Sequence, residues 1–251
     1  MKPNICVALP IKSGNVKENY AIIKRVLESK PDLIEFRFDY IEEISQLTPD
    51  FVKVSLNLIK PDVLSIFTFR DPSEGGQCAI SQADRLKIIN LLIESHPDYL
   101  DIEMNTKTEH LSEIINLADK NKVKLIFSYH DFEKTPSFEA ASDIFEGFKD
   151  KLLSNRLIDA LTLKEVTYKI IFTAQSFEDN FIPIKLCKVV SEKEKDQGII
   201  SFCMGELGIF SRIMCVKFGS FLTYGSLEDK TAPGQINIKK IRELHQLLFS
   251  N

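Results

Sequence analysis

His130 follows an apolar run, residues 123–127, that is typical of a buried strand. The chain turns polar directly after it, with Asp131, Glu133 and Lys134. In parallel α/β proteins, catalytic side chains gather at the carboxyl ends of strands. His130 is the only one of the four histidines in such a position. Either it is a structural hydrogen-bonding residue or it is a general acid or base in a site formed with other strands.

Charged side chains recur late in five consecutive apolar segments. Residues two apart in a strand share a face, and the pattern holds for Glu35 with Arg37, Thr68 with Arg70, Asp101 with Glu103, Ser128 with His130, and Lys169 with Ile171 and Thr173. Unpaired charge is costly to bury, so these groups must pair with each other or with a ligand. An internal salt-bridge network explains any one strand equally well, whereas five in succession favour a site.

These residue types suit the chemistry of a carbonyl substrate. A desolvated lysine near cations loses its proton more readily and forms a Schiff base, which is a role for Lys169. His130 would move a proton at the adjacent carbon, and Glu103 on the neighbouring strand would fix the tautomer of His130. The arginines would hold a polar or anionic substrate. The set lacks clustered metal ligands, so we expect no metal.

Two loops favour a small anionic substrate. Residues 204–208, MGELG, lead into a segment that contains Ser211 and Arg212. A glycine-containing loop before a helix binds anions, although the motif is weak alone. Residues 231–235, TAPGQ, form a polar loop that would most often be an ordinary turn.

The elements that must position these residues alternate regularly. Strands are expected at 4–9, 33–38, 63–69, 99–104, 123–129, 167–173, 198–204 and 221–224, and helices at 16–30, 48–59, 81–95, 108–120, 137–153, 176–195, 209–218 and 238–249. Eight such units in 251 residues predict a parallel α/β fold, a (β/α)8 TIM barrel formed as a single domain over residues 1–251. A doubly wound open sheet is the alternative, but no GxGxxG or Walker loop supports it.

Composition narrows the partners and the compartment. A net charge of −4 and a pI near 5.7 argue against nucleic acid and anionic membranes. No apolar run approaches the ~20 residues of a membrane span, and the first residues lack a secretory apolar region. The five cysteines are scattered and never in CxxC spacing, as is typical of reduced thiols. We therefore expect a cytoplasmic protein.

At these residues the chain resembles type I 3-dehydroquinate dehydratase, a Schiff-base lyase of the shikimate pathway, which leads to chorismate and the aromatic amino acids. The matching segments occur in order along the whole chain: EFRFD (35–39), FTFRDPSEGGQ (67–77), LDIEM (100–104), SYHDFEKTP (128–136), YKIIFTAQS (168–176), MGELGIFSR (204–212), FGSFLTYGS (218–226) and TAPGQI (231–236). The resemblance implies a (β/α)8 barrel that works without metal or organic cofactor, as a homodimer.

The resemblance also implies roles for individual residues. Lys169 would form an imine with 3-dehydroquinate, His130 would act as general acid and base, and Glu103 would orient His130. The substrate-binding positions would be Glu35, Arg37, Arg70, Arg212, Thr231 and Gln235. The product would be 3-dehydroshikimate.

Some positions depart from the family pattern. Ala8 stands where the family often has serine, Phe202 where it often has methionine, and Thr231 where serine is usual, and we expect these changes to affect the lining of the pocket. Lys164 rivals Lys169 by residue type, but only Lys169 matches the family string. Two other functions remain open: a lysine-dependent aldolase or transaldolase acting on sugar phosphates, and an inactive barrel used for binding.

Overall fold

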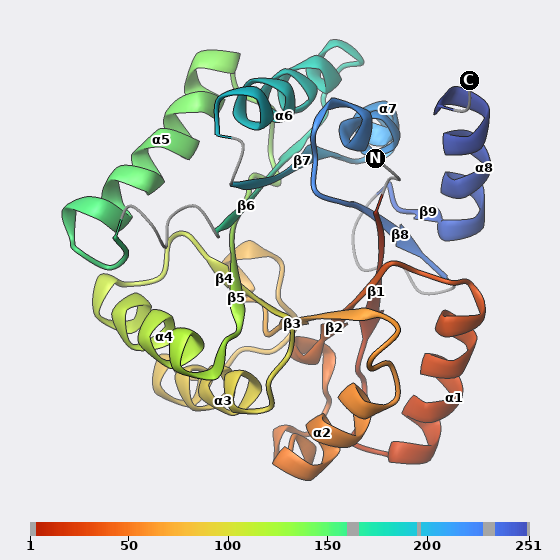
Figure 1. The fold of residues 1–251 in the computed structure, drawn as a ribbon, viewed down its shortest axis with the longest axis vertical. Helices are drawn as coiled ribbons and strands as arrows, with labels where there is room; N and C mark the ends of the chain where they lie inside the picture. Colours follow the sequence, from red (N-terminus) through yellow and green to blue (C-terminus); the bar gives the residue numbers. More distant parts are fainter. Residues whose placement is uncertain (1–3, 160–165, 195–196, 228–233, 250–251) are drawn as a thin grey trace.

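The computed structural model describes residues 4–159, 166–194, 197–227 and 234–249. Within these ranges, parallel strands curl around a central axis and helices cover the outside (Figure 1). The strands are β1 Ile5–Pro10, β2 Leu33–Arg37, β3 Leu64–Thr68, β4 Tyr99–Glu103, β5 Lys124–His130, β6 Thr167–Thr173, β7 Gly198–Met204, β8 Thr223–Ser226 and β9 Ile236–Asn237. The helices are α1 Val16–Glu28, α2 Pro49–Asn57, α3 Gln82–Glu94, α4 Thr108–Asn121, α5 Phe138–Ser154, α6 Phe181–Lys193, α7 Ile209–Met214 and α8 Ile238–Phe249.

The order of the strands confirms the barrel class that the sequence predicts. The strands pair in the order β7-β6-β5-β4-β3-β2-β1-β8-β9, and every pairing is parallel. A doubly wound sheet would reverse its strand order at a switch point, and this sheet instead follows the chain from β1 to β7. The two-residue strand β9 was not expected from the sequence.

The curled sheet is joined by backbone hydrogen bonds unequally around its circumference. Within the described ranges, β7 and β8 share no strand ladder and lie toward opposite ends of the pairing order. The Phe221 amide, just before β8, donates to the Ile199 carbonyl of β7 at 2.7 Å. We call this place the β7–β8 seam.

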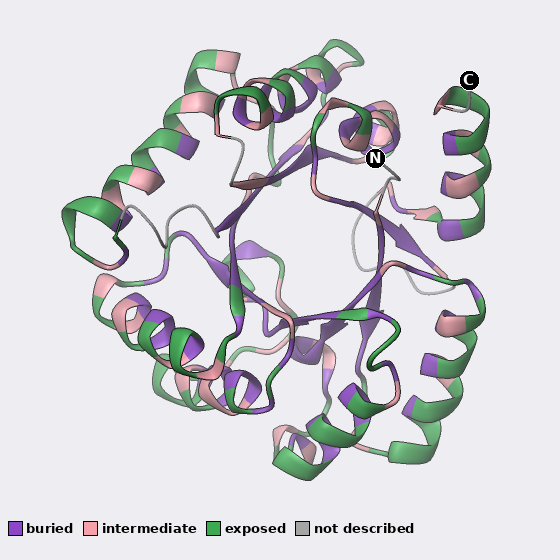
Figure 2. Cartoon of the chain, in the orientation of Figure 1, coloured by how far each residue is buried: buried purple, intermediate pink, exposed green. Residues whose placement is uncertain are grey.

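The two faces of the strands bury different kinds of side chain. Phe36 of β2 and Phe38, directly after that strand, pack with Phe67 of β3, with ring centroids 5.0–6.0 Å apart. Their neighbours Glu35 and Arg37 are also buried but take the opposite face. Figure 2 shows that the strands are mostly buried and that the helices bury the faces they turn toward the sheet. The alternation expected from the sequence therefore separates an apolar layer under the helices from a polar interior.

Helix starts follow the capping residues in most cases. The hydroxyl of Thr48 accepts from Phe51 N at the start of α2, and that of Ser81 accepts from Asp84 N at the start of α3. The expected start of α4 at residue 108 is confirmed, although Lys107 at the cap position makes no side-chain cap hydrogen bond. None of the helices within the described ranges is both long and apolar enough to cross a membrane.

Candidate active site

A cavity among the inward-facing side chains brings most of the predicted site residues together. Its lining includes Glu35, Arg37, Arg70, His130, Lys169, Arg212 and Gln235. Thr231 and the rival Lys164 lie outside the described residues. Glu103 is buried but does not line this cavity. Side chains up to 200 positions apart in the sequence, from Glu35 to Gln235, therefore line one cavity.

Lys169 projects from β6 into a strongly charged interior. Its Nζ donates to Asp101 Oδ2 at 2.9 Å and to Glu35 Oε1 at 3.4 Å. It also lies 4.6 Å from the centre of the Tyr224 ring of β8. The side chain is nearly fully buried. The lysine is thus held in a buried ion-pair network with two carboxylates.

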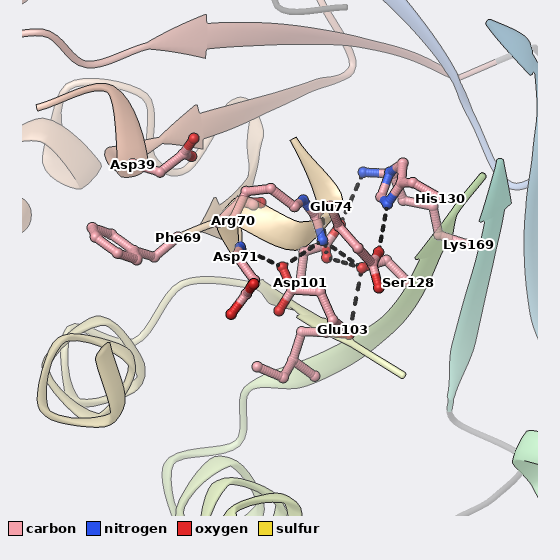
Figure 3. Close-up of polar contacts among 12 residues, drawn as sticks. Asp39, Phe69, Arg70, Asp71, Glu74, Asp101, Glu103, Ser128, His130 and Lys169 are labelled. Atoms are coloured by element: carbon pink, nitrogen blue, oxygen red, sulfur yellow. Dashed lines mark hydrogen bonds and ion pairs between the residues drawn. The ribbon is translucent and has the colours of Figure 1, made fainter. Parts of the chain in front are cut away.

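Arg70, directly after β3, ties the next strands together (Figure 3). Its guanidinium lies 2.8 Å from Asp101 Oδ1 and 2.8 Å from Glu103 Oε1, and it donates to Ser128 Oγ at 2.6 Å. Burial by itself would raise the pKa of Asp101, but the cations of Arg70 and Lys169 outweigh it and hold that pKa well below its usual range. Asp101 therefore stays ionised.

The predicted role of Glu103 as the partner of His130 was wrong. Both oxygens of Glu103 are engaged elsewhere, one by Arg70 and the Asp71 amide, the other by Arg85 of α3. The strand register explains the error, because Glu103 lies opposite Ser128. His130 is two residues further along β5, toward the carboxyl end. Side-chain alternation showed that the two residues share the inner face, but it did not show this offset along the strands.

Glu74 is the carboxylate that contacts His130, and the sequence reasoning missed it. Its Oε2 lies 3.0 Å from His130 Nδ1, and both side chains are largely buried. Glu74 sits in the 3-10 turn Pro72–Glu74 that follows β3. It lies within the string FTFRDPSEGGQ, but strand periodicity gives no information about a turn. The match of this string to the family was the one feature of the sequence that could have pointed to Glu74.

Burial makes this pair electrically neutral near neutral pH. Burial lowers the pKa of His130 well below its usual value, and the cations of Arg70 and Lys169 lower it further. Burial also raises the pKa of Glu74 to about 8. The imidazole therefore stays uncharged, and the contact through Nδ1 fixes the orientation of the ring.

The opposite wall of the cavity holds the other predicted binding residues. Arg212 of α7 is fully buried, with its guanidinium 4.4 Å from the centre of the Phe202 ring, and burial lowers the pKa of Arg212 to about 10. Arg37 forms two hydrogen bonds of 2.8 Å to Asp39. The charge of Arg37 is therefore already balanced by a neighbouring carboxylate.

The positions that depart from the family pattern lie in different places. Phe202 of β7 lines the cavity that holds Lys169. Ala8 of β1 instead lines a second cavity, between β1 and α1. Within the described part of the chain, no three His, Cys, Asp or Glu side chains are grouped so that they would hold a metal ion.

The fold is a parallel (β/α) barrel, and its cavity is lined by a buried lysine and a histidine. This arrangement is typical of a barrel enzyme. The sequence model of the type I 3-dehydroquinase family matches residues 5–251, and the chain belongs to that family of hydro-lyases. The resemblance stated from the sequence is confirmed.

Individual relatives agree with the family match. The 3-dehydroquinate dehydratase of Listeria innocua is 31% identical, covering 98% of this chain and 92% of its own. That of Clostridioides difficile is also 31% identical, covering 100% and 93%. A crystal structure of the type I enzyme from Clostridium difficile, with covalently modified comenic acid, superposes with a TM-score of 0.79 at 29% identity over 98% of this chain and 92% of that one. The enzyme from Geobacillus kaustophilus gives a TM-score of 0.84 at 23% identity, over 100% and 93%, which supports the fold alone.

Proposed function

We propose that this chain dehydrates 3-dehydroquinate to 3-dehydroshikimate through an imine on Lys169. The reaction would belong to the shikimate pathway, which supplies chorismate and the aromatic amino acids. The observation that carries the proposal is the placement of the buried Lys169 and His130 in one cavity, with two carboxylates in contact with the lysine. Membership of the family and the names of the relatives support the choice of substrate.

The first steps use Lys169. Its neutral amine adds to the ketone carbon, and the carbinolamine loses water to give a protonated imine. Before the attack the ammonium must give up a proton. Glu35 is within hydrogen-bonding reach to accept it, whereas Asp101, whose pKa is held well below its usual range, is a poor acceptor. The positive nitrogen then draws electrons from the adjacent carbon, so it stabilises the negative charge that develops there.

His130 would perform the proton transfers that follow. Its Nε2 takes the proton from the carbon next to the imine, and the electron pair moves into the imine to form an enamine. The same imidazole then returns the proton to the neighbouring hydroxyl, which leaves as water. Hydrolysis of the remaining imine releases the product and restores Lys169. Glu74 would orient the ring throughout by its contact with Nδ1.

Arg212 and Gln235 would hold the substrate carboxylate on the opposite wall. Both line the cavity, and Arg212 retains its charge at neutral pH even with a pKa lowered by burial to about 10. A guanidinium that accepts a carboxylate through two hydrogen bonds also fixes its orientation. Glu35, Arg37 and Arg70 would contact the hydroxyl side of the substrate. Thr231 is assigned to binding from the sequence resemblance alone.

A sugar-phosphate aldolase is the less favoured enzyme. Its phosphate would have to bind the loop before α7, but amide groups there are already used. Ser211 N donates to Asn180 Oδ1, and Gly208 N donates to the Gly205 carbonyl. An inactive binding barrel is disfavoured because Lys169 and His130 both line the cavity.

Borohydride trapping tests the proposal. We expect 3-dehydroquinate plus borohydride to add one reduced adduct, which peptide mapping places on Lys169. Lys169→Met should form no adduct and should not produce the absorbance of the enone carboxylate product. An adduct on Lys164, or turnover by Lys169→Met, would overturn the assignment.

The remaining expectations concern the whole protein. We propose a single catalytic domain that acts as a cytoplasmic homodimer on a small molecule, without metal or cofactor. Sedimentation equilibrium measures the oligomeric state, and full turnover after chelator treatment is the expected result for a metal-independent reaction.

A further inference from the structure

Phe132 occupies an unusual position for a large apolar residue. It lies two residues after His130, in the connection from β5 to α5, and 46% of it is exposed. Its ring nevertheless lies nearly parallel to the His130 imidazole, with centroids 6.2 Å apart and planes inclined by 26°. It also lines the cavity that contains Lys169. One edge of this ring therefore faces solvent and the other faces the reacting groups.

The turn after β3 is shaped to receive this ring. Gly75 has φ +84°, a conformation that side-chain-bearing residues rarely adopt. A Cβ atom at Gly75 would lie only 2.7 Å from Cζ of Phe132. Glycine is needed here for its conformation and for the close approach of the aromatic ring. The ring thus rests against the backbone directly after Glu74, the residue that contacts His130.

The side chains of Glu74 and His130 are less exposed to solvent than their position at the end of the barrel would suggest. Both groups lie in or beside the loops at the carboxyl end of the barrel, yet their side chains are only 6% and 10% exposed. Phe132 contacts the surroundings of both, through the imidazole on one side and Gly75 on the other. An apolar ring in that place removes water from two polar groups that water would otherwise reach.

We propose that Phe132 is a positioning residue that covers the Glu74–His130 pair, excludes water from it, and so keeps the imidazole uncharged for proton transfer. This inference rests on the proposed function, because it assumes that His130 is the base. It adds a task for a residue that need not contact the reacting atoms itself.

Other groups also act on His130, and the test must allow for them. The charged groups around it are Glu74 from the turn after β3, Arg70 from the end of β3, Asp101 from β4, Lys169 from β6 and Arg37 from β2. None of these residues is replaced in the Phe132 variants, and water admitted beside Glu74 favours its carboxylate, which raises the pKa of His130 in the same direction. A shift in the titration of His130 on replacing Phe132 therefore reports hydration of the pair.

The sign of the expected shift follows from the cause. Burial is the largest contribution that lowers the pKa of His130. Water admitted beside the ring stabilises the imidazolium, so the pKa must rise toward the ordinary value of about 6.5. Burial shifts the pKa of such groups by up to about 3–5 units. We expect loss of the Phe132 ring to raise the pKa of His130 by about one unit or more.

Imidazole titration by nuclear magnetic resonance measures this directly. Histidine-labelled protein carries four imidazoles, and His130→Gln assigns the signal of His130. Phe132→Ala should raise the titration midpoint of His130, whereas Phe132→Leu, which keeps an apolar cover, should leave it near the original value. Phe177→Ala is the matched control, since Phe177 is 49% exposed and does not line the cavity. If Phe132→Ala does not fold, Phe132→Gln admits water at the same place.

The same variants should show a defect in activity that depends on pH. On the acid limb, kcat/KM follows the uncharged fraction of His130, so each unit of rise in its pKa costs about tenfold at low pH and little at pH 8. An unchanged titration midpoint in Phe132→Ala, or an equal rise in Phe132→Leu, would overturn the proposal. Near-normal turnover by His130→Ala would instead reject the proposed role of His130, while the titration result would still decide whether Phe132 keeps the pair dry.

Discussion

At the scale of single residues, side-chain alternation placed the lysine and the histidine, but not their partners. Lys169 and His130 lie in regular strands, where a period of two decides which face a residue takes. Glu74 lies in a 3-10 turn, where no such period applies. Asp101 was expected on the inner face, but its contact with Lys169 depends on three-dimensional distance. Strand patterns therefore predict which residues face the interior of the barrel, and not which of those residues contact one another.

His130→Ala should reduce kcat by about 10²–10⁴, the usual contribution of general acid–base catalysis. The imine itself depends mainly on Lys169, so the variant should still give a borohydride-reduced adduct that mass spectrometry detects, although more slowly. Failure to form any adduct would mean that His130 already acts during imine formation. Turnover close to that of the original protein would remove His130 from the mechanism.

Glu74→Gln should change how stability depends on pH. The folded-state pKa of about 8 lies above the unfolded value near 4.3. The stability contributed by this proton is therefore fully present below the unfolded pKa and is lost as the pH rises through about 8. Urea midpoints at pH 5 and pH 8 should show the original protein losing stability relative to Glu74→Gln. Glu192→Gln, at an exposed site on α6, retains Glu74 and serves as control, so its loss of stability between the two pH values should equal that of the original protein.

At the scale of elements, Glu103 connects β4 with α3 and with the end of β3. It lies between Arg70 and Arg85, and all three side chains are buried. Removing one partner of a buried ion pair leaves an uncompensated charge, which costs about 3–5 kcal/mol. Glu103→Gln should therefore lower the free energy of unfolding by about that amount, measured by urea denaturation.

The same variant separates Glu103 from Glu74. Glu103→Gln should leave the titration of His130 nearly unchanged, whereas Glu74→Gln should alter it strongly, because Glu74 contacts the ring while both oxygens of Glu103 are bound to other groups. An equal effect of the two variants on His130 would restore the role that the sequence first suggested for Glu103.

The short helix α7 positions the proposed carboxylate-binding group. Thr223 of β8 donates to the Arg212 carbonyl at 2.6 Å, which holds this residue in place. Arg212→Lys keeps the charge but loses the planar pair of donors, so we expect KM to rise about tenfold with a smaller change in kcat. Steady-state kinetics on 3-dehydroquinate measure both constants. An unchanged KM would show that Arg37 or Arg70 binds the carboxylate.

Element boundaries were less predictable than element order. The expected helices 176–195 and 209–218 were too long, because their apolar pattern continues through 3-10 turns at Glu178–Asn180 and Cys215–Phe218. Helical periodicity does not distinguish a 3-10 turn from the end of an α-helix. The start of β6 at Thr167, in contrast, agrees with the expectation.

At the scale of the molecule, regular alternation of strands and helices was enough to predict the barrel, because a parallel sheet allows few arrangements. What the sequence did not show is that the sheet is joined unequally around its circumference. Lys169 belongs to β6, beside one edge of the β7–β8 seam. Gln235 directly precedes β9, which pairs with β8 beside the other edge.

A substrate bound covalently to Lys169 and held by Gln235 would link these two edges, so the ligand itself would join them where the backbone supplies few hydrogen bonds. Amide hydrogen exchange should then slow most at β7 and residues 221–224 once the reduced adduct has formed. The strands β2 and β3, which are paired on both sides, serve as the internal reference. Equal slowing in both regions would show that the ligand tightens the barrel as a whole and not the seam. The rigidity of the enzyme would thus be completed by its own reaction intermediate.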